Sequence, residues 1–279
     1  MRVIHASDIT NSIYKACVDA AYFINDDVIN RIIDAKEKES DKIAKGILSQ
    51  IIENDLLAKN EYIPMCQDTG VVLVFVEVGR EVYVDSNIEN AINEGVKKAY
   101  TEAFLRKSVV RNPIDRINTN DNTPAVIYYK IVEGDKLKLS ICLKGAGSEN
   151  MSKTKMLNPS DGIDGIKKFI VDSVIEAGGR PCPPLVLGIG IGGTMDKASV
   201  MSKEALLRNI DDKSDNEKIA KLESEIYELV NKTNVGPMGL KGDTTCLAVK
   251  INYYPCHIAS LPVALTIQCH AHRHKEVIL

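Results

Sequence analysis

The chain has 279 residues, 44% of them hydrophobic and 26% charged, so it can bury one large core or two smaller ones. A net charge of −3 gives no general field for nucleic acid or an anionic membrane, and no apolar run reaches the ~20 residues of a bilayer span. The N-terminus lacks the apolar core of a signal peptide, so the sequence predicts a cytoplasmic protein with no nucleic-acid or membrane partner.

Helical patterns occupy the first 60 residues, where apolar side chains recur three and four positions apart between charged ones. A buried strand is expected over 71–77, and a helical stretch follows over 88–104. Residues 112–124 are rich in Asn, Asp, Thr and Pro and therefore predict an irregular surface or site loop. The next residues predict two strands joined by a short turn at 133–135.

The second half begins with an expected loop of glycine and small polar residues over 144–156, followed by an amphipathic helix over 160–179. Residues 180–198 predict a cysteine-containing turn, a buried strand, a glycine loop and a helix start. The charged segment 200–232 predicts a solvated helical arm or hairpin, and short apolar strands follow it. The fold class expected is α/β (mixed α+β), with a helical N-terminal region and then mixed sheets flanked by helices, in one unit without a linker.

The seven cysteines are odd in number and widely spaced, and no CxxC pair occurs, so free thiols or metal ligands are expected rather than disulfides. Cys66, Cys182 and Cys269 stand at the ends of predicted elements beside polar or rigid residues. The other cysteines either fall in apolar patterns typical of core packing or, next to His257, are ambiguous. The core candidates are Cys17, Cys142 and Cys246, and the ambiguous one is Cys256.

Three thiolates from distant loops suit an iron–sulfur cluster in which one iron has no protein ligand. Such an iron can act as a Lewis acid on a substrate hydroxyl and carboxylate. The plain alternative is that all seven thiols are buried and inert, and spacing alone favours it.

Other polar and glycine motifs are ambiguous taken singly. His257, in a turn-like stretch, is a candidate for acid–base work, whereas the His-x-His-x-His run that ends at His274 is typical of a solvated terminus. GIGIGGT lacks the GxGxxG spacing of a dinucleotide site and indicates a close backbone approach instead. KGAGSEN offers backbone amides to a carboxylate, and Arg106 or Arg111 could hold a dicarboxylate.

Five motifs occur in order along the chain: MCQDTG, KGAGSENMS, CPPLVLGIGIGGTMDKA, GPMGLKGDTTCLAVKI and CHIASLPVALTIQCHAHRH. Together they resemble the α subunit of the two-subunit iron–sulfur hydro-lyases, the class I fumarate hydratases and L(+)-tartrate dehydratases. The resemblance covers nearly the whole chain. It implies the Fe–S hydro-lyase α-type fold, with residues 1–279 as a single catalytic domain and the β-type domain on a separate subunit.

The resemblance implies a [4Fe–4S] cluster held by Cys66, Cys182 and Cys269. Cys66 matches the family's Cys-Gln-Asp-Thr-Gly ligand, and Cys182 matches its Cys-Pro-Pro ligand. Cys269 matches the ligand near the end of the domain, twelve residues after His257. Two other cysteines stay open as alternatives for this third ligand, namely Cys246 and Cys256.

The resemblance also implies a set of substrate contacts beside the cluster. Asp68 and His257 would manage the proton on the substrate oxygen, and Arg106 would hold a carboxylate and stabilise charge on it. The implied substrate-binding residues are Gln67, Asp68, Arg106 and the backbone of Gly145 or Gly147.

The activity implied is reversible hydration of fumarate, a C4 dicarboxylate, to L-malate, with dehydration of L(+)-tartrate to oxaloacetate as the alternative. In this family a base and further carboxylate-binding residues come from the β region, so we expect a fumarate hydratase β subunit in an α2β2 assembly. The accessible iron predicts activity that is lost in air and recovered with iron and reductant.

Two readings from other classes are minor. A non-catalytic iron–sulfur or redox-sensing protein would need a resolving cysteine, but neither Cys66 nor Cys182 has a cysteine close by in sequence. A zinc hydrolase built on the His-rich tail would lack the HExxH helix of that class.

Overall fold

The computed structural model describes residues 2–279, which form two compact units. Each unit is assembled from stretches that are far apart in the sequence: 2–24, 55–146 and 273–279 in the first, and 25–54 and 147–272 in the second. Both units combine helices with a sheet that has parallel and antiparallel pairs, so the predicted mixed α/β class is confirmed.

The expected N-terminal helices are present as α1 (Ala6–Tyr22), α2 (Asp26–Lys38) and α3 (Lys42–Glu61). Helix α1 belongs to the first unit and α2 to the second, while α3 begins in the second unit and ends in the first. Within residues 2–279, none of the helices combines the length and apolarity that crossing a membrane requires.

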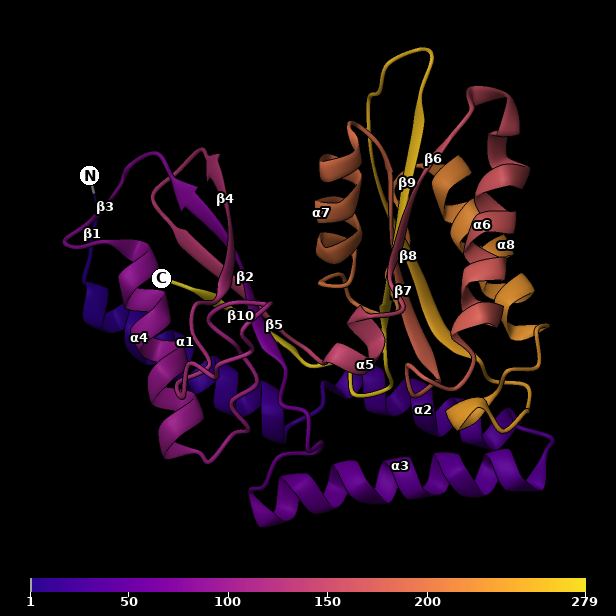
Figure 1. Cartoon of the computed structure of the whole chain (residues 1–279), viewed down its shortest axis with the longest axis horizontal. Helices are drawn as coiled ribbons and strands as arrows, with labels where there is room; N and C mark the ends of the chain where they lie inside the picture. The colour runs from indigo at the N-terminus through magenta and orange to yellow at the C-terminus, as the bar shows by residue number, and fades with distance from the viewer. Residues whose placement is uncertain (1) are drawn as a thin grey trace. The chain divides into compact units, whose positions relative to one another are not determined.

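The sheet of the first unit has the strand order β10-β5-β2-β4 (Figure 1). Strand β2 runs parallel to β4 and antiparallel to β5, and β10 pairs antiparallel with the other side of β5. Strands β4 and β5 are joined by the predicted short turn but do not pair with each other, because β2 lies between them. The bounds are β2 (Val71–Gly79), β4 (Val126–Val132), β5 (Leu137–Lys144) and β10 (His274–Ile278). A separate parallel pair consists of β1 (Arg2–Ile4) and β3 (Val82–Val84).

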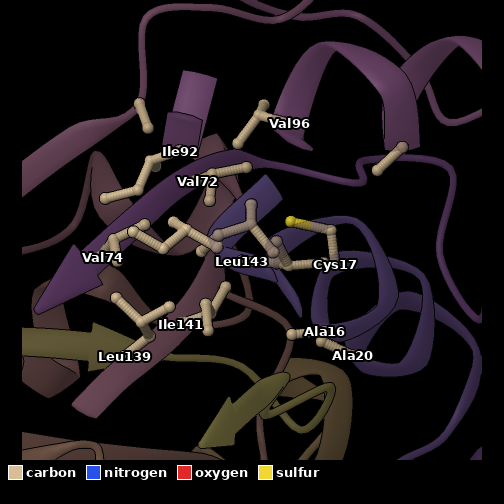
Figure 2. Close-up of a cluster of buried hydrophobic side chains, with 14 of the residues drawn as sticks. Ala16, Cys17, Ala20, Val72, Val74, Ile92, Val96, Leu139, Ile141 and Leu143 are labelled. Carbon is tan, nitrogen blue, oxygen red and sulfur yellow. The ribbon is translucent and has the colours of Figure 1, made fainter. Parts of the chain in front are cut away.

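Helices α1 and α4 (Ile88–Glu102) pack against each other, and α1 also packs on β5 and β10 of this sheet. Figure 2 shows Cys17 of α1 among aliphatic side chains of α4, β2 and β5, such as Val96, Val72 and Leu143. This buried cluster drives the assembly of the first unit, since burial of apolar surface is its main favourable term. Residues 103–125 form no helix or named strand, and this segment contains the irregular loop predicted over 112–124.

The sheet of the second unit has the order β6-β9-β7-β8, with α7 on one face and α6 and α8 on the other (Figure 1). Strand β7 runs parallel to β8 and antiparallel to β9, and β6 pairs antiparallel with β9. The strands are β6 (Lys153–Leu157), β7 (Leu185–Gly192), β8 (Cys246–Tyr254) and β9 (Leu261–Gln268). The helices are α5 (Ala146–Glu149), α6 (Gly162–Ala177), α7 (Met195–Ala205), α8 (Glu217–Asn231) and the short 3-10 turns η1 (Pro159–Asp161) and η2 (Pro237–Gly239).

Two sequence expectations are wrong in the second unit. The loop expected over 144–156 contains the helix α5 and the strand β6, because β6 gains ladder hydrogen bonds from β9 that local composition does not reveal. The segment 200–232 is not a solvated arm. Helix α8 buries Leu222 and Ile226 in the core of this unit, so its apolar stripe is covered by the sheet.

The glycine loop predicted within residues 180–198 is also wrong, because the glycines of GIGIGG lie mostly within strand β7. A Cβ atom at Gly190 would lie 2.0 Å from the carbonyl oxygen of Ala198 in α7. Only glycine therefore lets helix and strand approach this closely.

Candidate functional site

Several loops of the first unit meet at one end of the strands of its sheet. Because β2 and β5 are antiparallel, the start of β2 at Val71 pairs with the end of β5 at Lys144. The MCQDTG turn before β2 therefore lies beside KGAG after β5. Strand β10 is antiparallel to β5, and the backbone amide of Leu143 donates to the carbonyl of Arg273, so the residue that precedes β10 reaches the same end.

Asp68 is held at this end of the sheet by contacts from three segments. Its Oδ1 lies 3.1 Å from Nη2 of Arg106 and accepts a 3.1 Å hydrogen bond from the backbone amide of Gly70. Its Oδ2 accepts a 2.8 Å bond from the amide of Ala146. The carboxylate is thus fixed in orientation, while the Arg106 side chain remains 54% exposed and able to meet an anion.

The other predicted residues of this unit lie close by in sequence. Cys66 is half-buried in the turn before β2, and Gln67 is exposed. The Cβ position of Gly145 lies 3.1 Å from Oδ2 of Asp68, so the glycine backbone of KGAGS borders the carboxylate. Arg111 is exposed, and its backbone amide bonds Ile117 within the loop. The structure therefore brings Asp68, Arg106 and Gly145 together.

In the second unit, Cys182 and Cys269 lie at the same end of the sheet, beside two neighbouring central strands. Cys182 precedes β7 and Cys269 follows β9, and the antiparallel register pairs Val186 with Gln268. The amide of His270 donates to the carbonyl of Cys182 at 3.3 Å. Cys182 is exposed and Cys269 is half-buried, so both thiols remain outside the hydrophobic core.

The turn around Cys182 is braced by a segment that sequence reasoning did not assign to the site. Cys182 has φ of 55°, in the left-handed region that non-glycine residues rarely adopt, and such strain is common where geometry serves function. The amide of Met238 donates to the carbonyl of Pro183 at 2.8 Å. A Cβ atom at Gly239 would lie 2.4 Å from Cα of Gly179, so GPMG must carry glycine there to pack on this turn. The GPMGLKG motif was the sequence feature that could have assigned this segment to the site.

The two sheets share one pattern of strand pairing, since each has a parallel pair at one edge and two antiparallel pairings after it. Their connectivity differs at the other edge, where β10 is the last strand of the first sheet in chain order and β6 is the first strand of the second. Strand β2 corresponds to β7, and β5 corresponds to β9. Cys66 and Cys182 therefore precede equivalent strands, and Gly145 and Cys269 follow equivalent strands. These four residues therefore occupy equivalent ends of the two sheets.

The remaining cysteines divide as their sequence patterns predict. Cys17, Cys142 and Cys246 are buried, and burial raises the pKa of both Cys17 and Cys246 to about 12. Core packing is thus confirmed for these three. Of the alternatives for a third ligand, Cys246 is enclosed in the core, and Cys256 is exposed in the loop that connects β8 to β9.

His257 lies in that same loop, at the end of the sheet opposite Cys182 and Cys269, because Tyr254 at the end of β8 pairs with Gly192 at the end of β7. Strand β9 separates the two ends by ~23 Å at about 3.3 Å per residue. The structure does not bring His257 to the cysteines within the second unit, and its acid–base role stays a prediction. The His-rich tail also differs from a solvated run, since His272 is buried.

Gly147 belongs to the second unit, is exposed, and its Cβ position lies 3.6 Å from the carbonyl oxygen of Arg180. Of the two glycines, Gly145 is therefore the one that lies beside Asp68 within the first unit.

Among residues 2–279 as they stand, no three His, Cys, Asp or Glu side chains are grouped closely enough to hold a metal ion.

Comparison with known proteins gives consistent matches over nearly the full chain. Residues 10–278 match the family model described as fumarate hydratase (fumerase). The chain is 44% identical over 274 residues to the Methanocaldococcus jannaschii protein named "Putative L(+)-tartrate dehydratase subunit alpha", covering 96% of this chain and 95% of that protein. It is 31% identical over 252 residues to the L(+)-tartrate dehydratase subunit alpha of Escherichia coli (strain UTI89 / UPEC), covering 89% and 83%.

Proposed function

Because this chain belongs to the fumarate hydratase family of iron–sulfur hydro-lyases, we propose that it is the α subunit of a [4Fe–4S] hydro-lyase acting on a C4 dicarboxylate. The reaction proposed is the reversible addition of water to fumarate, which gives L-malate. The observation that carries this proposal is the Asp68–Arg106 pair, because it places a fixed carboxylate and an accessible guanidinium beside the Gly145 backbone.

The donor set of the chain fits a cluster with three cysteine ligands. We assign Cys66, Cys182 and Cys269, which lie at strand ends and outside the cores. Cys256 also lies near a strand end and outside the cores, but at the end of the second sheet opposite Cys182 and Cys269. Cys182 and Cys269 come together within the second unit. When bound, a cluster with one iron free of protein ligands supplies a Lewis acid for the hydroxyl and carboxylate of the substrate.

The chain's own residues would bind the substrate and move a proton. Arg106 would hold a substrate carboxylate, since a guanidinium presents paired donors in the geometry that a carboxylate accepts. Asp68 would take or give the proton of the substrate hydroxyl, because its carboxylate is oriented by the amides of Gly70 and Ala146. Gln67, exposed beside Asp68, would add a polar contact.

Dehydration of L(+)-tartrate is the second candidate, and the names of the relatives that match this chain favour it. Tartrate carries one hydroxyl more than malate. The family model described as fumarate hydratase supports the first candidate. A polar pocket built to bind the extra hydroxyl would reject malate strongly, because its donors and acceptors would be left unpaired.

The relatives are named alpha subunits, so we propose that a β subunit completes the enzyme, in an α2β2 assembly. The test is anaerobic co-purification with a candidate β subunit, iron and sulfide analysis, and parallel rate measurements with L-malate, fumarate and L(+)-tartrate. We expect turnover by the complex and little or none by this chain alone. A complex with intact cluster that neither hydrates fumarate nor dehydrates L-malate or L(+)-tartrate would refute the proposed activity.

The ligand assignment predicts a pattern of thiol protection. In the cluster-loaded complex, iodoacetamide at pH 8 is expected to spare Cys66, Cys182 and Cys269 and to modify Cys256, whereas the cluster-free chain should react at all four. The references are Cys17 and Cys246, which should stay unmodified in both states. At a thiol pKa of about 12, only ~10⁻⁴ of each is thiolate at pH 8.

Peptide mass spectrometry measures the extent of alkylation at each cysteine. Protection of Cys256 in place of Cys269 on cluster loading would reassign the third ligand to Cys256, in the loop between β8 and β9. Equal alkylation of Cys182 in the loaded and cluster-free states would remove it from the ligand set.

A further inference from the structure

Three buried side chains of the first unit donate hydrogen bonds to consecutive carbonyls of the MCQDTG turn. Nη1 of Arg273 donates to the carbonyl of Asp68 at 2.7 Å. The hydroxyl of Tyr100 shares its single proton between the carbonyls of Thr69 and Gly70, at oxygen–oxygen distances of 2.8 and 3.0 Å. Nδ2 of Asn122 also donates to Gly70, at 3.1 Å. We call Tyr100, Asn122 and Arg273 the carbonyl clamp.

The members of the carbonyl clamp come from separate parts of the chain and share a buried environment. Tyr100 is in α4, Asn122 is in the 103–125 loop, and Arg273 directly precedes β10. The exposed fractions are 0%, 0% and 1%, respectively, so none of the three is placed to touch a substrate. Hydrogen bonds from buried donors of this kind fix one backbone arrangement.

Asn122 joins the turn to the segment that carries Arg106. While its Nδ2 bonds Gly70, its Oδ1 accepts from the backbone amides of Ser108 and Val109 at 2.7 and 3.3 Å. The hydroxyl of Thr69 adds a second link, with a 2.9 Å bond to the carbonyl of Arg106. One amide group therefore couples the two backbone segments that bear the Asp68–Arg106 pair.

The donors of the carbonyl clamp are permanent at physiological pH. Burial raises the pKa of Tyr100 above its usual range, so the hydroxyl keeps its proton. Arginine stays protonated in proteins, and an asparagine amide does not titrate.

We propose that Asn122 is a positioning residue that holds Asp68 and Arg106 in register through the carbonyl clamp. It acts by fixing two backbone segments and makes no contact with substrate. The proposal deepens the proposed function, on which its catalytic consequence rests.

The first test separates the two arms of Asn122. Asn122→Asp keeps an acceptor for Ser108 and Val109 but replaces the donor to Gly70 with an oxygen. In the full complex we expect amide hydrogen exchange at Ala146, the donor to Asp68 Oδ2, to rise about tenfold, which corresponds to ~1.4 kcal/mol and lies in the range for losing a buried hydrogen bond. Exchange at Ser108 should change little. Unchanged exchange at Ala146 would overturn the proposal.

The matched control is Asn120→Asp in the same loop. Asn120 has φ of 67° against 63° for Asn122, but its side chain is exposed, so the control makes the same chemical change in the same backbone conformation. We expect wild-type exchange and kcat from it. If Asn122→Asp does not fold, Tyr100→Phe removes the neighbouring donor while keeping the ring, and the same rise at Ala146 is expected.

The second test is a double-mutant cycle on kcat per intact cluster. Asn122→Asp should lower kcat about tenfold in the wild-type background and less than about twofold in Asp68→Asn, because positioning acts through Asp68. Additive effects would mean a merely structural role and overturn the proposal. A wild-type complex without hydro-lyase activity would refute the proposed function instead, and the exchange result would then decide the positioning role alone.

Discussion

Replacing Cys182 by serine is expected to remove cluster iron from the complex and to lower kcat by at least about a thousandfold. Cys182 is exposed and lies beside Cys269. The GPMG segment holds it in a strained turn directly before β7, so its thiol has a fixed position. A Lewis acid contributes several kcal/mol to charge stabilisation, and ~4 kcal/mol corresponds to about a thousandfold in rate. Iron and sulfide content and the visible absorbance of the cluster measure the loss.

The control for this change is Cys256→Ser, since Cys256 is also an exposed cysteine of the second unit but lies at the opposite end of the sheet. We expect full iron content and wild-type kcat from it. The reverse outcome, with iron lost on changing Cys256 and kept on changing Cys182, would contradict the assignment of Cys182.

Replacing Asp68 by asparagine is expected to lower kcat by about a hundredfold to ten-thousandfold while the cluster stays intact. Positioned proton transfer contributes ~10²–10⁴ to rate, and an amide cannot accept or return the proton. The new NH₂ group would also oppose a donor, either the Ala146 amide or the Arg106 guanidinium, that now faces the carboxylate. Steady-state rates normalised to cluster content give the measurement.

Asp115→Asn provides the comparison, because Asp115 is an exposed aspartate of the 103–125 loop in the same unit. Its kcat and KM should equal those of the wild type. An Asp68→Asn complex that retains more than about a third of wild-type kcat would exclude Asp68 from proton transfer, whatever its effect on KM.

Much of the site was readable because its residues stand in local motifs. MCQDTG and the Pro-Cys-Pro-Pro turn identify Cys66 and Cys182 by rigid or polar neighbours at strand ends, and the structure keeps both outside the cores. Apolar periodicity likewise located the N-terminal helices, because the pattern of a helix depends on neighbours within a few residues. The same pattern placed Cys17 in a core and so separated it from the candidate ligands.

The residues that support the site were not readable in this way. Asn122 lies in a loop whose composition indicates only a turn, and Arg273 stands in a His-rich tail. Each is defined by a partner far along the chain: Asn122 bonds Gly70, and Arg273 bonds the carbonyl of Asp68. A hydrogen bond across such a separation leaves no periodic mark in the sequence.

The sequence by itself determined the family, the mixed class and the order of most elements, because motifs and apolar periods are local properties. Tertiary structure alone decided that β2 lies between β4 and β5, that α8 covers the second sheet, and that His257 lies at the end of that sheet opposite Cys269. Strand order and register arise from long-range backbone pairing, and the face on which a helix packs depends on surfaces that exist only after the chain has folded.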